Sequence, residues 1–286
     1  MIETMLTYTA DCIASVLFFE VFHIPFLILW LLSGGLFFTL KLRFVNIRLF
    51  GHAVAVIRGR YSKPSDVGDV SHFQALSAAV SATVGVGNIA GVAIAISIGG
   101  PGAVIWMAIA GLLGMSTKFA EVTLGHYYRD YDSNGRISGG AFHYLTKGLA
   151  EQGRHKLGYY LSGLFCILCI IGSFGAGNMF QSNQVVAAIT QFDAITTAWP
   201  IALLMALSIG VILIGGITRI ASITQLIVPT MAVLYFIATI AVLAVNIQAI
   251  PSAIYLMLTD AIGMSALSGG ILGSLITGIQ RAAFSN

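Results

Sequence analysis

The chain has 286 residues, of which 57% are hydrophobic and 9% charged, and its mean hydropathy is +0.91. Because a soluble domain carries about 25% charged residues, this composition excludes a soluble globular protein and indicates a polytopic membrane protein. The formal net charge of +3 gives no indication of nucleic-acid binding, since the basic residues are spread along the chain.

Apolar segments alternate with polar or turn-forming stretches, and we expect an all-α membrane protein. In chain order the expected spans are 26–40, 73–98, 103–127, 158–189, 201–217, 220–246 and 264–279. A mixed lead-in precedes the first span, which Pro25 opens, and 46–57 is expected as a surface helix. The uncharged turn at 99–102 reads Gly-Gly-Pro-Gly. Pro229 predicts a kink in the sixth span.

The basic residues predict the topology. The loops 41–72 and 128–157 hold eleven of the fourteen Lys and Arg residues, whereas the links 99–102, 190–200 and 247–263 hold none. By the positive-inside rule the two basic loops are cytoplasmic and the three links external. We therefore expect a multi-pass protein of the cell (inner) membrane whose N-terminus lies outside.

The segment around which the chain is organised is Ser77–Ile98, interrupted at its middle by Gly85-Val86-Gly87-Asn88. Glycine lowers helix stability by about 1 kcal/mol relative to alanine, and lipid offers no partners for the freed backbone groups. A break is therefore tolerated where it lines a cavity, as in the sites of many secondary transporters. The alternative is close helix packing through Gly87 and Gly91, which have Gly-xxx-Gly spacing.

Polar side chains at membrane depth are costly and need an explanation. The Asn88 amide, within the break, is suited to coordinate a sodium ion or to cap freed backbone groups. The hydroxyls of Ser81 and Thr83 lie on the preceding turn. They are expected either to contact a substrate or to bond back to their own helix.

Two further groups of polar residues lie in later spans. Asn178, Gln181 and Ser182 share one helix face, which predicts either substrate contact by Gln181 or interhelical hydrogen bonds. Lys118 and Glu121 are one turn apart, so a structural ion pair is the simplest expectation, with a gate or proton relay as the alternative. No nucleophile–base pair, phosphate loop or metal-ligand spacing is present in the sequence, so we expect neither an enzyme nor a metal centre.

Five motifs resemble the alanine/glycine:cation symporter family. They occur in family order between residues 68 and 286 and read GDVSHFQALSAAVSATVGVGNIAGVAIAISIGGPGAVIWM, GMSTKFAEVTLGHYYR, GGAFHYLTKGL, GNMFQSNQV and TGIQRAAFSN. The resemblance implies sodium-coupled symport of alanine or glycine, with sodium as a transported ion rather than a prosthetic group. It also implies the inverted-repeat fold of the LeuT group, with five plus five core helices after an extra N-terminal span.

By this resemblance the break belongs to the first core helix, and the helix that starts near Ile89 presents N–H groups to the substrate carboxylate. The residues implied for the substrate are Thr83, Gly85, Gly87, Asn88, Ile89 and Gln181. Those implied for sodium are Gly85, Val86 and Asn88. The family often has threonine where this chain has Val86, which removes a hydroxyl from the site.

The resemblance also implies a domain organisation. Residues 1–72 form a lead-in, the extra span and a basic cytoplasmic loop, 73–246 the first five-helix repeat, and 247–286 an external link and an incomplete sixth core helix. The family continues beyond this point with four or more helices, so a truncated chain is expected, with a chain carrying the second repeat as a candidate partner. The alternatives are a non-transporting or partner-dependent half-carrier subunit, or a proton-coupled amino-acid carrier that uses Glu121 or Asp69.

Overall fold

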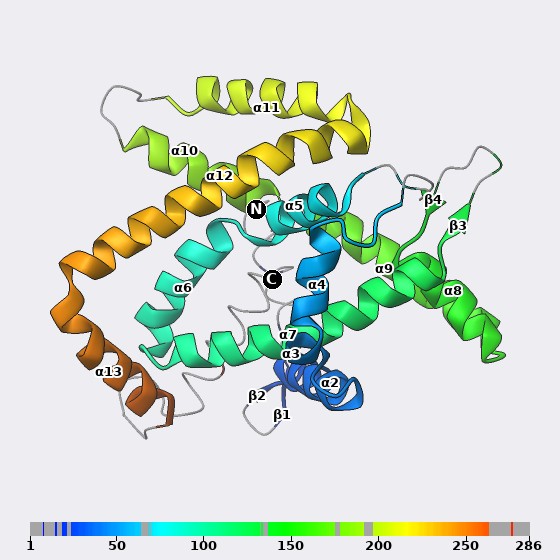
Figure 1. Ribbon diagram of the computed structural model, residues 1–286, viewed down its shortest axis with the longest axis horizontal. Helices are drawn as coiled ribbons and strands as arrows, with labels where there is room; N and C mark the ends of the chain where they lie inside the picture. Colours follow the sequence, from blue (N-terminus) through cyan, green and yellow to red (C-terminus); the bar gives the residue numbers. More distant parts are fainter. Residues whose placement is uncertain are drawn as a thin grey trace. The chain divides into compact units, whose positions relative to one another are not determined.

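The structure is a computed structural model that describes residues 8, 15, 19–21, 24–63, 68, 70–131, 133, 137–174, 178–191, 197–262 and 276. Its elements are β1 Glu20–Val21, β2 Ile24–Pro25, α2 Phe26–Lys41, α3 Val45–Arg48, α4 Phe50–Ile57, α5 His72–Thr83, α6 Val86–Gly99, α7 Ala103–Tyr127, β3 Asp130–Tyr131, β4 Ile137–Ser138, α8 Ala141–Glu151, α9 His155–Phe174, α10 Phe180–Thr190, α11 Trp199–Leu213, α12 Gly216–Val245, η2 Ile247–Ala249 and α13 Ile250–Ile262. The chain is thus mostly helical (Figure 1), and β1–β2 and β3–β4 are two short antiparallel hairpins.

The chain divides into two compact units. The first comprises Met1–Arg48, Gly87–Thr117 and Ala241–Asn286, and the second comprises Leu49–Val86 and Lys118–Ile240. The long helices α7 and α12 therefore contribute residues to both units.

In the first unit, α2 packs closely against α7. A Cβ added to Gly35 would lie 3.0 Å from the Leu113 Cβ, so glycine permits this approach. From α3, the Asn46 side-chain amide donates a hydrogen bond to the Leu112 carbonyl of α7 over 3.0 Å. The Thr39 hydroxyl is buried and donates to a carbonyl of its own helix, which satisfies a polar group that has no access to water.

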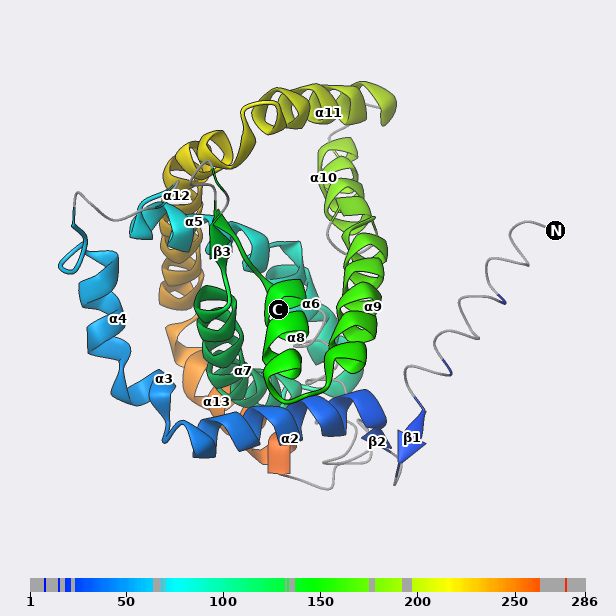
Figure 2. The same cartoon turned by 90° about the vertical axis from the view of Figure 1, so that its right-hand side faces the viewer.

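In the second unit, α8 and α9 lie side by side in both views (Figures 1 and 2). The turn between them is closed by the Gly153 and Arg154 amides, which donate to the Ala150 and Leu149 carbonyls. Gly153 has φ +75°, which glycine adopts without steric cost. A Cβ added to Gly158 would lie 2.6 Å from the Leu145 carbonyl oxygen, so this glycine sets the spacing of the two helices.

Four helical segments are long and apolar enough to cross a membrane, namely His72–Gly99, Ala103–Tyr127, His155–Ser173 and Gly216–Val245. Within the described residues, three shorter apolar helical stretches are also present, namely α2, α11 and Ile247–Ile262. The first two correspond to the spans expected at 26–40 and 201–217, whereas Ile247–Ile262 lies where the sequence predicts an external link. The expected span 264–279 lies outside the described residues apart from Ile276.

The bounds of α7 are those predicted, but one other prediction was wrong in detail. The span expected at 158–189 contains α9 and α10, and residues 175–177 between them lie outside the described part. The boundary expected at Arg219 lies instead at 214–215, because Gly216 has φ +68° and begins α12. Glycine, rather than the charged residue, marks the turn.

Candidate functional site

The site begins with the interruption between α5 and α6. Ser71 starts α5 with a capping box: its hydroxyl accepts a hydrogen bond from the Gln74 amide, and the Gln74 side chain accepts one from the Ser71 amide. This reciprocal pair satisfies two amides that the first helical turn leaves without a partner. The helix ends at Thr83, Val84 is extended with φ −92° and ψ 93°, and α6 begins at Val86. The break therefore lies where the glycines predict it.

The two helix ends at this break carry no compensating charge. No basic residue lies in the last turn of α5, and no acidic residue lies in the first turn of α6. A helix carries about half a negative charge at its C-terminus and half a positive charge at its N-terminus. The backbone next to Gly85 can therefore favour a cation at the end of α5 and an anion at the start of α6.

The Gln181 side chain, in the first turn of α10, lies against Gly85. A Cβ added to Gly85 would lie 3.2 Å from the Gln181 Nε2 and 3.4 Å from its Oε1. Both residues belong to the second unit. The structure thus brings together an amide and a backbone break that are 96 positions apart in the sequence (181 minus 85).

The other expected site residues near the break are placed as follows. The Thr83 hydroxyl donates to the Ala79 carbonyl over 3.0 Å, and the Ser81 hydroxyl donates to the Ala78 carbonyl over 2.7 Å. Both hydroxyls therefore bond back to their own helix, which was the alternative to substrate contact. The backbone of the next four residues, 86–89, forms the first turn of α6, and the Ile89 side chain is exposed.

A repeated sequence pattern lies between α9 and α10, and the sequence analysis did not single it out. The tetrapeptide Gly-Ala-Gly-Asn at 175–178 repeats the pattern Gly-Val-Gly-Asn at 85–88. Residues 175–177 lie outside the described part. The Asn178 side chain donates to the Ser173 carbonyl over 2.8 Å, so its amide binds the carbonyl of a residue five positions earlier in the chain.

The charged residues at the end of α7 form local contacts. The Lys118 Nζ lies 3.0 Å from the Glu121 Oε2, and both side chains are exposed. An exposed pair of this kind contributes little to stability. Within the described ranges, no group of three or more His, Cys, Asp or Glu residues is arranged to hold a metal ion.

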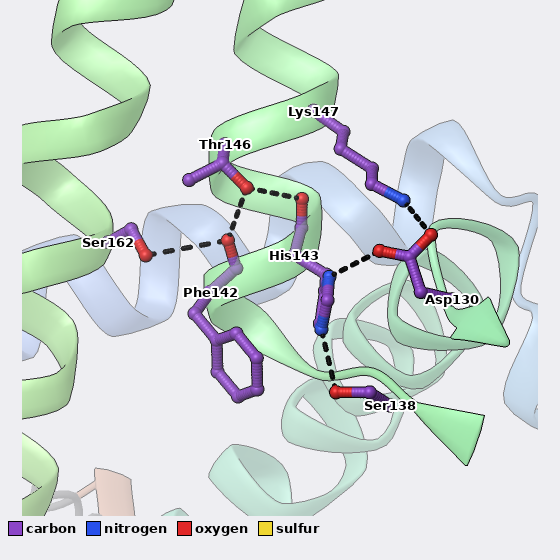
Figure 3. A network of polar contacts seen from close by, with 7 residues as sticks. All are labelled: Asp130, Ser138, Phe142, His143, Thr146, Lys147 and Ser162. Carbon is purple, nitrogen blue, oxygen red and sulfur yellow. Dashed lines mark hydrogen bonds and ion pairs between the residues drawn. The ribbon is translucent and has the colours of Figure 1, made fainter. Parts of the chain in front are cut away.

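A polar cluster joins the β3–β4 hairpin to α8 (Figure 3). Asp130 accepts a hydrogen bond from Lys147 and pairs with the His143 Nδ1 over 3.2 Å, and the Ser138 hydroxyl lies 3.0 Å from the His143 Nε2. The hydrogen bond from Lys147 is the main reason that the pKa of the Asp130 carboxyl lies below its ordinary value. This cluster fixes the hairpin to α8 and lies outside the apolar segments.

Comparison with known proteins places the chain among transporters. The model of the sodium:alanine symporter family matches residues 8–286. The sodium/alanine symporter AgcS of Methanococcus maripaludis is 39% identical over 266 residues, which cover 92% of this chain and 57% of AgcS. The probable sodium/glutamine symporter GlnT of Bacillus subtilis is 37% identical, with 91% of this chain and 52% of GlnT covered.

The amino-acid carrier protein AlsT of Bacillus subtilis is 35% identical, with 90% of this chain and 53% of AlsT covered. The chain therefore spans between 52% and 57% of the length of these three relatives. The family that matches is one of transporters, not enzymes, and sodium is its coupling ion. The long apolar helices and the family match together show that this chain belongs to the sodium:alanine symporter family.

Proposed function

We propose that the protein carries alanine or glycine together with sodium across the cell membrane. The observation that carries this proposal is the break at Val84–Gly85, where a helix C-terminus and a helix N-terminus meet without a charged residue in either adjoining turn. A zwitterionic amino acid with a sodium ion supplies one anion and two cations to such a site. Interrupted helices serve this purpose in many secondary transporters.

The substrate carboxylate is assigned to the start of α6. The backbone of residues 87–89 lies in its first turn, and the N–H groups of a helix's first turn point along the axis toward its N-terminal end. Those groups and the positive end of the helix dipole favour a carboxylate. The geometry of the helix start supports this assignment of the carboxylate to backbone groups rather than to a charged side chain.

Sodium is assigned to the other end of the break. A hard cation prefers oxygen ligands, and the last carbonyls of a helix are oriented along its axis beyond its end. We assign the sodium to carbonyls around Gly85 and Val86, together with the Asn88 amide oxygen. Because no basic residue lies in the last turn of α5, no positive side chain there competes with the ion.

Gln181 is assigned a direct role in binding the amino acid, because its amide lies against Gly85. Thr83 is assigned to the same site because it ends α5 directly before the break, while its hydroxyl bonds to α5. We expect a site for so small an amino acid to exclude large side chains by steric overlap. It separates alanine from glycine only weakly, since one methyl group is worth about 1–3 kcal/mol.

The fold proposed for the protein is the inverted-repeat fold of the LeuT group, with residues 73–246 as its first repeat and the N-terminus outside. The energetics suit concentrative uptake. One sodium ion moving through 100 mV releases about 2.3 kcal/mol, and a tenfold sodium gradient adds about 1.4 kcal/mol. Together these are enough to concentrate a zwitterion several hundredfold.

The test is uptake of labelled alanine by cells that express the full chain, at fixed pH, with and without an inward sodium gradient. Membrane insertion is measured in parallel. Sodium-driven uptake is the expected result. Uptake that follows a proton gradient without sodium would overturn the proposal in favour of a proton-coupled carrier, and no uptake by a well-inserted chain would favour a partner-dependent subunit.

A pair of variants tests the location of the site. Gly87→Leu places a bulky side chain in the first turn of α6 and is expected to abolish alanine binding. Gly91→Ala, one turn further along, meets no atom within 4 Å of its new Cβ and should bind normally. Normal binding by Gly87→Leu would show that the glycines serve helix packing instead.

A further inference from the structure

The turn between α6 and α7 is attached to the end of α13, more than 150 residues further along the chain (Figure 1). The Gly102 amide donates a hydrogen bond to the Asp260 Oδ2 over 2.8 Å. The Trp106 indole Nε1 donates to the Ala261 carbonyl over 3.2 Å. Gly102 directly precedes α7 and Trp106 lies in the first turn of that helix, so the start of α7 contacts two consecutive residues of α13.

Two glycines make this contact sterically feasible. A Cβ added to Gly102 would overlap the Ala261 amide nitrogen and lie 2.7 Å from the Ala261 Cα. A Cβ added to Gly100, whose φ is +79°, would overlap the Asp260 carboxylate. Gly102 is buried, and Ala261 is 1% exposed. The turn and the end of α13 therefore approach more closely than a side chain at position 100 or 102 would allow.

The charge of Asp260 fits its position. No acidic residue lies in the first turn of α7, so its helix dipole is not compensated from within that turn. The Asp260 carboxylate supplies a negative charge there through a charge-assisted hydrogen bond, which is about twice as strong as a neutral one. The lack of an acidic residue in the first turn of α7 and the two glycines that allow close approach thus each favour this contact.

We propose that Asp260 is a positioning residue that acts through the Gly102 amide, so that α6 and α13 move as one body during transport. The turn Gly100–Gly102 directly follows α6, and the stretches 87–117 and 241–286 belong to the same compact unit. Fixing this turn fixes the C-terminal end of α6, and thereby the direction in which its N-terminus points. The inference rests on the proposed function only in assigning the substrate carboxylate to that N-terminus.

Amide hydrogen exchange of the purified full chain tests the contact without any transport assay. Asp260→Ala should raise the rate of amide exchange about tenfold or more in peptides covering 98–106 and 250–262, because a hydrogen bond to a charged acceptor is lost. Asp260→Asn keeps an acceptor and should show a smaller rise. Gly111→Ala is the control, since its Cβ meets no atom within 4 Å in the same helix.

Unchanged exchange in both peptides of Asp260→Ala would overturn the contact itself. Gly102→Ala is a second variant that disturbs the same contact from the turn that precedes α7, and it should raise the rate of amide exchange in 250–262 as well. Each variant should therefore raise the exchange rate in both peptides. If each variant raises it only in the peptide that carries the substitution, α6 and α13 do not move together and the proposal is wrong.

Sodium-dependent binding of labelled alanine tests the positioning role. Asp260→Ala should weaken binding about three- to tenfold, and Asp260→Asn should recover most of the loss, because it restores an acceptor for the Gly102 amide. Faster exchange with unchanged affinity would refute the link to the substrate site. If the unmodified chain binds no amino acid, the proposed function fails, whereas hydrogen exchange still decides the contact between α7 and α13.

Discussion

Gly85→Ala is expected to weaken amino-acid binding while leaving the protein almost as stable as before. The new Cβ would lie 3.2 Å from the Gln181 Nε2 and 3.5 Å from its Cδ. The first distance is shorter than an ordinary contact by a few tenths of an ångström. Because Gln181 is a long and flexible side chain, its terminal amide can move by that amount at little cost in folding free energy.

The effect on binding is larger, because the displaced amide is the group that we assign to the substrate. A hydrogen bond of this kind contributes about 0.5–1.5 kcal/mol, which corresponds to about a two- to tenfold change in the dissociation constant. Gln181→Ala removes the amide altogether and should weaken binding by a similar factor. We therefore expect the double variant to bind no more weakly than Gln181→Ala alone.

The assay is binding of labelled alanine to purified protein at fixed sodium concentration, for the parent, both single variants and the double variant. Thermal unfolding is measured on the same samples as the control for folding. The quantity of interest is the coupling free energy between positions 85 and 181, since the effects of substitutions at residues in contact are not additive. Effects that multiply in the double variant would refute the contact between Gly85 and Gln181 as the origin of the loss.

Three further predictions concern stability. Gly158→Ala places a Cβ 2.6 Å from a carbonyl oxygen of α8 and should lower the unfolding free energy by about 1–3 kcal/mol. Gly163→Ala in the same helix meets no atom within 4 Å, so equal melting temperatures for these two variants would contradict the packing. Ser71→Ala removes the capping box of α5 and should lower the unfolding free energy by about 1 kcal/mol. The loss should be measurable as faster amide exchange in the first turn of α5, and an unaltered exchange rate there would argue against the cap. Because the hydrogen bond from Lys147 lowers the pKa of Asp130 from its ordinary value of 3.8, its stabilising contribution is present above pH 3.8 and disappears as the pH falls through the lower folded value. Asp130→Asn should therefore melt below the parent at pH 5 and converge with it in stronger acid, and a constant difference across that range would disprove the assignment.

Features that depend on neighbouring residues could be predicted from the sequence. The break after Thr83 follows from the glycines at 85 and 87, and α7 occupies the predicted range because an apolar run there ends in polar residues. The Lys118–Glu121 contact follows from a spacing of three along one helix. In each case the energy that decides the structure comes from residues within a few positions of one another.

Contacts between distant segments could not be predicted in this way. Gln181 and Gly85 were separately expected at the substrate site, but only the tertiary structure places the amide of one against the backbone of the other. Asp260 belongs to the stretch 247–263, which the sequence predicts as an external link, and only the fold shows that its carboxylate accepts a hydrogen bond from Gly102.

The sequence by itself determined the membrane class, the family and the position of the main helix break. These depend on composition, motif order and local helix propensity, which are properties of short stretches of chain. The tertiary structure alone decided which glycines are needed for close approach and which carboxylate caps which helix. The physical reason is that steric overlap and hydrogen bonding act over a few ångströms in space, and only the folded chain determines which distant residues come within that range.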